Sequence, residues 1–114
     1  MDDLASFMHA LESSGLKARQ VKPVPGWEPI FGVRGHLVSI EGDRVTAFEY
    51  ETAKAAERLQ SSVSKDGDEV GDAIIDWCCP RFYAAGKLVV FHLGPGRSTN
   101  QILAQVLGPP FVPR

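Results

Sequence analysis

His92 is the residue of this sequence whose chemistry is closest to general acid–base catalysis. It lies in an apolar segment, and the carboxylates of Asp76 and Glu49 lie in two other segments that read as strands. A histidine at hydrogen-bond distance from a carboxylate is a common acid/base pair. The more frequent alternative is a hydrogen-bonded histidine on a half-exposed strand face. A small enzyme that uses His92 with Asp76 or Glu49 is therefore the second hypothesis for function.

Cys78 and Cys79 are the only cysteines, and they are adjacent. Zinc sites usually separate two cysteines by at least two residues and add further Cys or His ligands. Neighbouring residues of a strand point to opposite faces, so we expect the two thiols to diverge. We interpret them as structural thiols, one more buried than the other, and we predict neither a metal site nor a cofactor. Adjacent cysteines cannot staple a long loop, which suits a reducing compartment.

Aromatic side chains form a third group, on either side of a loop rich in Pro and Gly and around Pro80. Small-molecule pockets are mostly apolar and carry a few polar groups. Each ring taken singly is more often part of a core, but together the rings predict a pocket or a homodimer surface. The candidate binding residues are Trp27, Phe31, Trp77, Arg81, Phe82, Tyr83 and His92.

The junction Gly94-Pro95-Gly96-Arg97-Ser98-Thr99 leads from a strand into a helix. Free amides at a helix start, with Arg97 beside them, can hold an anion. The glycine spacing fits neither the phosphate loop nor the dinucleotide fingerprint. A tight turn is the alternative interpretation.

Apolar periodicity places these residues on three helices and about five strands. Leu4, Phe7, Met8 and Leu11 recur at helical spacing, with Asp2 or Asp3 as the cap. The expected helices are 3–14, 52–62 and one capped by Ser98, and the expected strands are 16–21, 30–33 with 36–40, 45–50, 73–79 and 88–93.

The short connections favour antiparallel neighbours. The predicted fold class is α+β: one domain over residues 1–114, with a single antiparallel sheet of about five strands and three helices packed mainly on one face. The most apolar strand, 88–93, is expected at the centre, and segment 80–87 is expected to connect it to strand 73–79.

Composition limits the classes of function. The chain has 114 residues, 44% of them hydrophobic, and a net charge of -2. That length allows one domain with a core of its own. No excess of basic residues supports nucleic-acid binding, and no apolar run is long enough to span a membrane. The N-terminal residues have neither the basic start nor the apolar run of a secretory signal, so a cytoplasmic location is expected.

The chain resembles a family of small bacterial proteins without an established activity, some of them made as exported lipoproteins. The resemblance covers most of the sequence from residue 29 onward. Arg81 stands where this family commonly has histidine, and Arg97 where acidic residues are frequent. The resemblance implies one compact domain. The residues that carry it are Pro29 with Phe31, Val45 with Phe48-Glu49-Tyr50, Ser64 with Asp66-Gly67, Gly71, Trp77, Pro80, Phe82-Tyr83, Gly86, 88–90, Gly94, and Leu107-Gly108 with Phe111.

The leading hypothesis is a small non-enzymatic binding or interaction module. Its expected partner is a small apolar molecule or another protein. Symmetric dimers are the commonest oligomers, so a homodimer through the aromatic set is the other form of this hypothesis.

Overall fold

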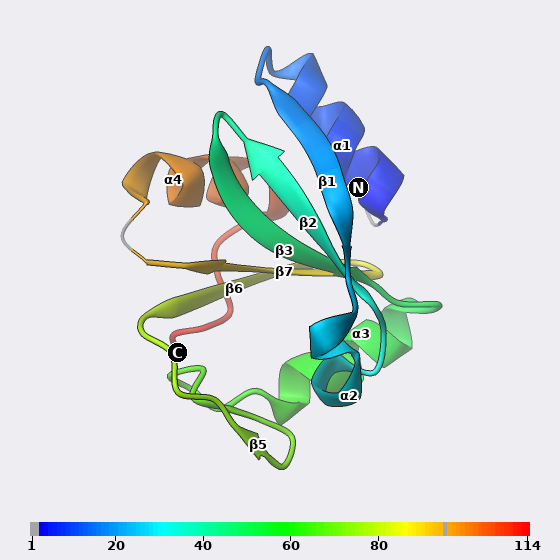
Figure 1. Ribbon diagram of the computed structural model, residues 1–114, viewed down its shortest axis with the longest axis vertical. Coiled ribbons are helices and arrows are strands. Elements are labelled where there is room, and N and C mark those ends of the chain that lie inside the picture. The colour runs from blue at the N-terminus through cyan, green and yellow to red at the C-terminus, as the bar shows by residue number, and fades with distance from the viewer. Residues whose placement is uncertain (1–2, 95) are drawn as a thin grey trace.

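The computed structural model describes residues 3–94 and 96–114 and arranges them around one antiparallel sheet (Figure 1). This sheet has five strands in the order β1-β2-β3-β7-β6, and a second, two-stranded sheet pairs β4 with β5. The strands are β1 Ala18–Val24, β2 Gly35–Ile40, β3 Asp43–Glu49, β4 Glu69–Val70, β5 Ala73–Ile74, β6 Pro80–Ala85 and β7 Leu88–Leu93. The α-helices are α1 Leu4–Ser13, α2 Glu28–Phe31, α3 Ala53–Ser62 and α4 Arg97–Leu107, and a 3-10 turn η1 covers Pro25–Trp27.

Each face of the sheet carries its own apolar cluster, because alternate residues of a strand point to opposite faces. α1 and α4 cover the first face, where they meet Val45 and Ala47 of β3. α2 and α3 cover the second face, where Phe31 and Leu59 meet Phe48. Figure 1 shows α1 and α4 in the upper half of the view and α2 and α3 in the lower half. The α+β class is confirmed, but the helices are shared between both faces instead of lying mainly on one.

β7 explains why both faces need a cover. Five of its six residues, Leu88 to His92, are buried. A strand with apolar side chains at nearly every position cannot leave either face in water. It lies between β3 and β6, so β3 takes the central position that the sequence predicted for β7.

The predicted starts of α1 and α3 are confirmed at their caps. Asp3 accepts a hydrogen bond of 2.8 Å from the Ser6 amide, and Thr52 accepts one of 3.0 Å from the Ala55 amide. Each cap satisfies an amide that has no partner within the helix. Asp2, the other cap candidate, and Pro95 lie outside the described residues.

The two edges of the sheet are protected in different ways. β1 continues through Pro23 at an edge position, where proline removes no hydrogen bond that the sheet needs. Along β6 the C-terminal segment covers the edge: Phe82 N donates to Val112 O at 3.1 Å, and Phe111 N donates to Phe82 O at 2.8 Å. Unpaired strand edges invite association, and both devices limit that exposure.

Four predictions of local structure are wrong. Segment 30–33 is not a strand: Ile30 and Phe31 belong to α2, a helix that Pro29 favours in its first turn. The helix ends at Gly32, whose φ of 81° suits glycine. Only Ala73 and Ile74 of the predicted strand 73–79 are in a strand, and the predicted connection 80–87 holds β6. Ser98 does not cap α4, since the helix already begins at Arg97 after Gly96.

Candidate functional site

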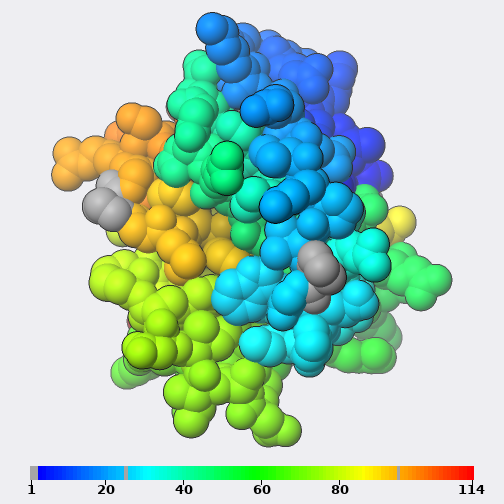
Figure 2. All heavy atoms as spheres, viewed as in Figure 1, coloured from blue at the N-terminus to red at the C-terminus, as the bar shows by residue number. Residues whose placement is uncertain are grey.

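Four of the candidate residues, Trp27, Phe31, Trp77 and Phe82, come together on the second face of the sheet. The Trp27 and Trp77 rings are 5.5 Å apart, and the Trp77 and Phe82 rings are 5.8 Å apart. Phe31 and Phe82 are buried, and the Trp77 indole N–H donates to Gly67 O at 2.9 Å. The rings pack against one another as the second apolar cluster. Figure 2 shows the segment that carries β4 and β5 next to the α2 segment at the lower end of the molecular surface.

The other three candidates, Arg81, Tyr83 and His92, lie on the first face. Phe82 and Tyr83 are adjacent in β6, so the strand directs them to opposite sides. Arg81 pairs with His92 in the register between β6 and β7. The seven candidate residues therefore form two separate groups, which the predicted aromatic pocket had combined into one.

His92 is the centre of a buried polar network on this first face. Its side chain is 2% exposed. Nε2 lies 2.9 Å from Asp43 Oδ2, and Nδ1 lies 3.1 Å from Asn100 Oδ1. The Thr99 hydroxyl donates to the same Asp43 oxygen at 2.6 Å, and the Tyr83 hydroxyl donates to Asn100 Oδ1 at 3.0 Å. The network ties β3, β6 and β7 to the first turn of α4.

The carboxylate partner of His92 is thus Asp43, and the predicted pairing with Asp76 or Glu49 is wrong. Glu49 lies at the other end of β3, where its Oε2 accepts a hydrogen bond of 2.8 Å from the Leu4 amide at the start of α1. Asp76 is exposed in the irregular segment before β6. Asp43 is the first residue of β3, directly after the β2–β3 turn.

Two local features bring Asp43 and α4 to the histidine. The two residues of the β2–β3 turn, Glu41 and Gly42, have φ of 49° and 86°, the positive values of a tight hairpin turn. Gly96 lies against the network, where a Cβ would be 2.7 Å from both Asp43 Oδ2 and His92 Cε1. Only glycine lets the first turn of α4 approach this closely.

Hydrogen bonding sets the charge of the carboxylate. Burial is the largest influence on the pKa of Asp43 and raises it, but the hydrogen bonds from Thr99, the Arg44 amide and His92 together hold this pKa below its ordinary value. Burial raises the pKa of Tyr83, and the charge of Arg81 opposes this in part. Asp43 is therefore ionised and Tyr83 is neutral at pH 7.

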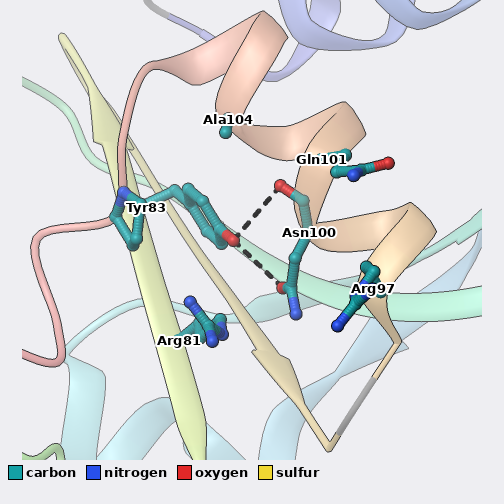
Figure 3. Close-up of a pocket in the computed structure, with 7 residues that line it drawn as sticks. Arg81, Tyr83, Arg97, Asn100, Gln101 and Ala104 are labelled. Atoms are coloured by element: carbon teal, nitrogen blue, oxygen red, sulfur yellow. Dashed lines mark hydrogen bonds between the residues drawn. The ribbon is translucent and has the colours of Figure 1, made fainter.

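A hollow of about 450 Å³ lies beside this network, between β6 and α4. Its walls are Arg81, Tyr83, Arg97, Asn100, Gln101, Ala104 and Pro110. Arg81 comes from β6 and Arg97 from α4, and their side chains are drawn on either side of Asn100 (Figure 3). Both are exposed. Among the described residues, neither guanidinium has a protein hydrogen-bond or ion-pair partner.

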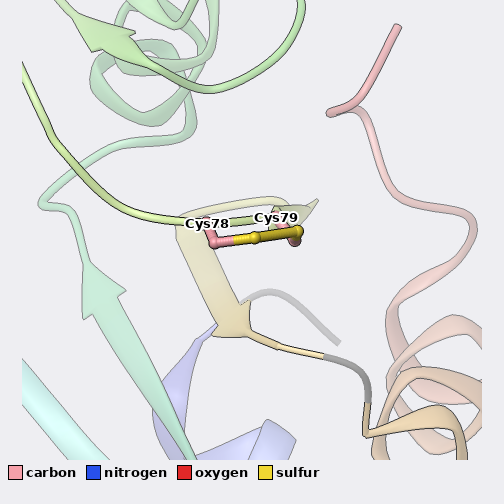
Figure 4. The surroundings of a disulfide bond; sticks show 2 residues. All are labelled: Cys78 and Cys79. Carbon is pink, nitrogen blue, oxygen red and sulfur yellow. A yellow bond between two sulfur atoms is a disulfide. The ribbon is translucent and has the colours of Figure 1, made fainter.

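The cysteines differ from their prediction. Cys78 and Cys79 form a disulfide between adjacent residues, and both are exposed (Figure 4). They lie in the irregular segment before β6, where Cys79 has a φ of 63°. The divergence of neighbouring side chains that a strand would impose does not apply there. The interpretation as structural thiols, one of them buried, is therefore wrong.

Comparison with known proteins finds no matching family, no matching curated protein and no matching solved structure. The resemblance to the small bacterial family and the homodimer stay predictions. The longest helix among the described residues has 11 residues, and none is both long and apolar enough to cross a bilayer. In the same part of the chain, no three His, Cys, Asp or Glu side chains are grouped so that they could hold a metal ion.

Proposed function

We propose that this protein is a non-enzymatic binding module whose ligand carries an oxyanion, held in the hollow between β6 and α4. The observation that carries the proposal is the pair of guanidinium groups, Arg81 and Arg97, that border one hollow without a protein partner among the described residues. Arginine presents a planar fork of donors that matches a carboxylate, phosphate or sulfate group. Two such forks from different elements give a ligand two anchoring points.

The remaining walls support a ligand larger than a bare ion. Gln101 and Asn100 offer amides for further hydrogen bonds, and Ala104 and Pro110 offer small apolar contacts. Ligand sites in proteins commonly enclose about 300 to 1,000 Å³, and the hollow of about 450 Å³ falls in that range. We propose an organic anion, or an acidic group displayed by a partner protein.

Binding fits the surroundings of His92 better than catalysis does. A general base needs a nitrogen that can reach the substrate. The ring is 2% exposed, and each nitrogen already faces an oxygen of Asp43 or Asn100. In this proposal His92 positions the walls of the hollow.

Sulfate titration monitored by nuclear magnetic resonance tests the proposal. At constant ionic strength, sulfate should shift the side-chain signals of Arg81, Arg97 and Asn100. Each of the variants Arg81→Gln and Arg97→Gln should bind sulfate about tenfold more weakly, or about 1.4 kcal/mol.

Arg19→Gln is the matched control, because Arg19 is an exposed arginine on β1, at the other edge of the sheet. It should bind sulfate as the wild type does. Equally weaker sulfate binding in all three variants would mean that only the net charge of the protein matters, and this would refute the site. Sulfate shifts confined to the aromatic set would refute it as well.

A further inference from the structure

Asn100 stands between buried His92 and the hollow. Its Oδ1 lies 3.1 Å from His92 Nδ1 and accepts a hydrogen bond of 3.0 Å from the Tyr83 hydroxyl. In Figure 3 the amide nitrogen points into the space that separates Arg81 from Arg97 in this view. A side-chain amide has one acceptor end and one donor end. Because the acceptor end is used by Tyr83 and His92, the donor end is presented to the hollow.

This orientation of the amide depends on a proton at His92 Nδ1. The other ring nitrogen, Nε2, lies 2.9 Å from Asp43 Oδ2, and an ionised carboxylate can only accept. An oxygen therefore faces each nitrogen, and only the imidazolium, protonated at both, donates to both. A neutral ring has a single N–H. If that proton serves Asp43, the lone pair of Nδ1 faces the Asn100 oxygen.

Rotation of the amide relieves this repulsion. The NH2 group of Asn100 would then donate to His92 Nδ1, and its oxygen would face the hollow. An oxygen at that position repels an anion that the NH2 group would have bound. The two protonation states of His92 thus give the hollow opposite polarity at one point of its wall.

Resting on the oxyanion site proposed above, we propose that His92 regulates this site: its protonation turns the donor end of Asn100 to the ligand, so that anion binding is coupled to proton uptake. The coupling passes through one side chain that contacts both groups. By linkage, the anion must favour the protonated ring by the same factor by which the proton favours anion binding.

The charges around His92 also predict that anion binding and protonation of the ring favour each other. Arg81 is its cross-strand partner in the register, and two positive groups on neighbouring strands repel each other. An anion beside Arg81 reduces this repulsion, while Asp43 stabilises the imidazolium in both states. The side chains around the ring and its two hydrogen-bond partners are Asp43 from β3, Arg81 and Tyr83 from β6, and Thr99 and Asn100 from α4.

The experiment measures sulfate affinity between about pH 5.5 and about pH 8, the interval in which histidine changes its charge. Sulfate is the probe because its own charge is constant over this interval. We expect binding to be at least about fivefold tighter at the lower pH, the smaller end of common coupling effects. In the same samples, the midpoint of the His92 ring titration followed by nuclear magnetic resonance should move to higher pH when sulfate is added.

Three variants test which residues cause the pH dependence of sulfate affinity. His92→Gln should bind sulfate with an affinity that no longer changes with pH. Asn100→Asp replaces the donor end with an acceptor and should bind sulfate weakly at every pH. His36→Gln removes the half-buried histidine of β2, and it should keep the full pH dependence of the wild type. If His92→Gln does not fold, the ring titration of the wild type with and without sulfate decides the question.

The outcomes separate this inference from the proposed function. No sulfate binding at any pH would refute the oxyanion site itself. Binding with equal affinity at both pH values, or a pH dependence that persists in His92→Gln, would leave the site intact and overturn the coupling. A sulfate-dependent shift of the His92 titration that Asn100→Asp abolishes would support both.

Discussion

Phe82 and Tyr83 are neighbours in β6, yet the two faces of the sheet that they enter are built in different ways. Phe82 is fully buried, and its ring packs against the rings of Phe31, Trp77 and Phe91 at centroid distances of 6.3, 5.8 and 5.8 Å. Tyr83 extends its hydroxyl group to Asn100 at the wall of a hollow. On the second face, called here the aromatic face, the rings of Phe31, Trp77, Phe82 and Phe91 pack against one another. On the first face, called here the polar face, a hollow borders the side chains of Arg81 and Arg97. The large aromatic side chains of this sequence therefore serve stability, whereas less conspicuous polar side chains surround the candidate site.

The largest predicted effect is the difference in stability between variants of Phe82 and Tyr83. Phe82→Ala should lower the free energy of unfolding by about 3 to 5 kcal/mol, as is usual when a buried aromatic ring is removed. Tyr83→Phe keeps the ring and loses one hydrogen bond, so it should cost about 1 kcal/mol. Urea denaturation followed by circular dichroism measures both values.

Sulfate affinity should rank the same two variants in the opposite order. The folded fraction of Phe82→Ala should bind sulfate as the wild type does, because Phe82 lies on the far face. Tyr83→Phe should bind it more weakly, because Asn100 loses one of the two donors that orient its amide. Weaker sulfate binding in folded Phe82→Ala would break the division between the faces.

The periodic parts of the fold could be predicted from the sequence. The stripe of Leu4, Phe7, Met8 and Leu11 predicts α1, and all four residues are buried. The alternation in residues 45–50 predicts which side chains of β3 share a face, and Phe48 and Ala47 do lie in different clusters. These patterns are local, because one helix or strand alone produces them.

The errors arose where a local pattern fits two structures. The segment with Trp77, Cys78 and Cys79 is as apolar as a strand, but tertiary packing of Trp77 on Trp27 and Phe91 holds it in an irregular path. β6 starts only at Pro80, at an edge, where proline is tolerated. Neither choice can be read from periodicity.

The candidate site was predictable only in part, for a related reason. Asp43 begins a strand directly after a turn and Asn100 lies in a helix, and neither belongs to a recognisable motif. They meet His92 across 49 and 8 residues of sequence, through the pairing of β3 with β7 and the docking of α4. Gly96 was the available signal, since a glycine at a helix start can mark a close approach.

An intermediate effect tests that close approach. Gly96→Ala places a Cβ 2.7 Å from Asp43 Oδ2 and His92 Cε1, so α4 or the network must move. Overpacking of this kind costs about 1 to 3 kcal/mol. We expect weaker sulfate binding as well, because Arg97 and Asn100 lie in the first turn of α4 and move with it.

Gly26→Ala is the control for this variant. A Cβ at Gly26 would meet nothing within 4 Å, so both its stability and its sulfate affinity should stay close to those of the wild type. If Gly96→Ala behaved in the same way, the contact between α4 and the polar network would be too loose to position a ligand.

The smallest predicted effect concerns a segment outside the two faces. The disulfide between Cys78 and Cys79 closes a loop that contains only these two residues. Stabilisation by a disulfide grows with the length of the closed loop, so the double variant Cys78→Ser with Cys79→Ser should change the free energy of unfolding by less than about 1 kcal/mol. Both cysteines are exposed, and serine fits there without a buried polar group.

The double variant also tests whether the two faces of the sheet are independent. Trp77 directly precedes the two cysteines and belongs to the aromatic face, whereas the hollow between β6 and α4 lies on the opposite side of β6. Tryptophan fluorescence is therefore expected to report any rearrangement of the segment, while sulfate affinity stays constant. A double variant that unfolds readily would make the disulfide a main support of the aromatic face. Lost sulfate binding in a stable double variant would show instead that the two faces are coupled through β6.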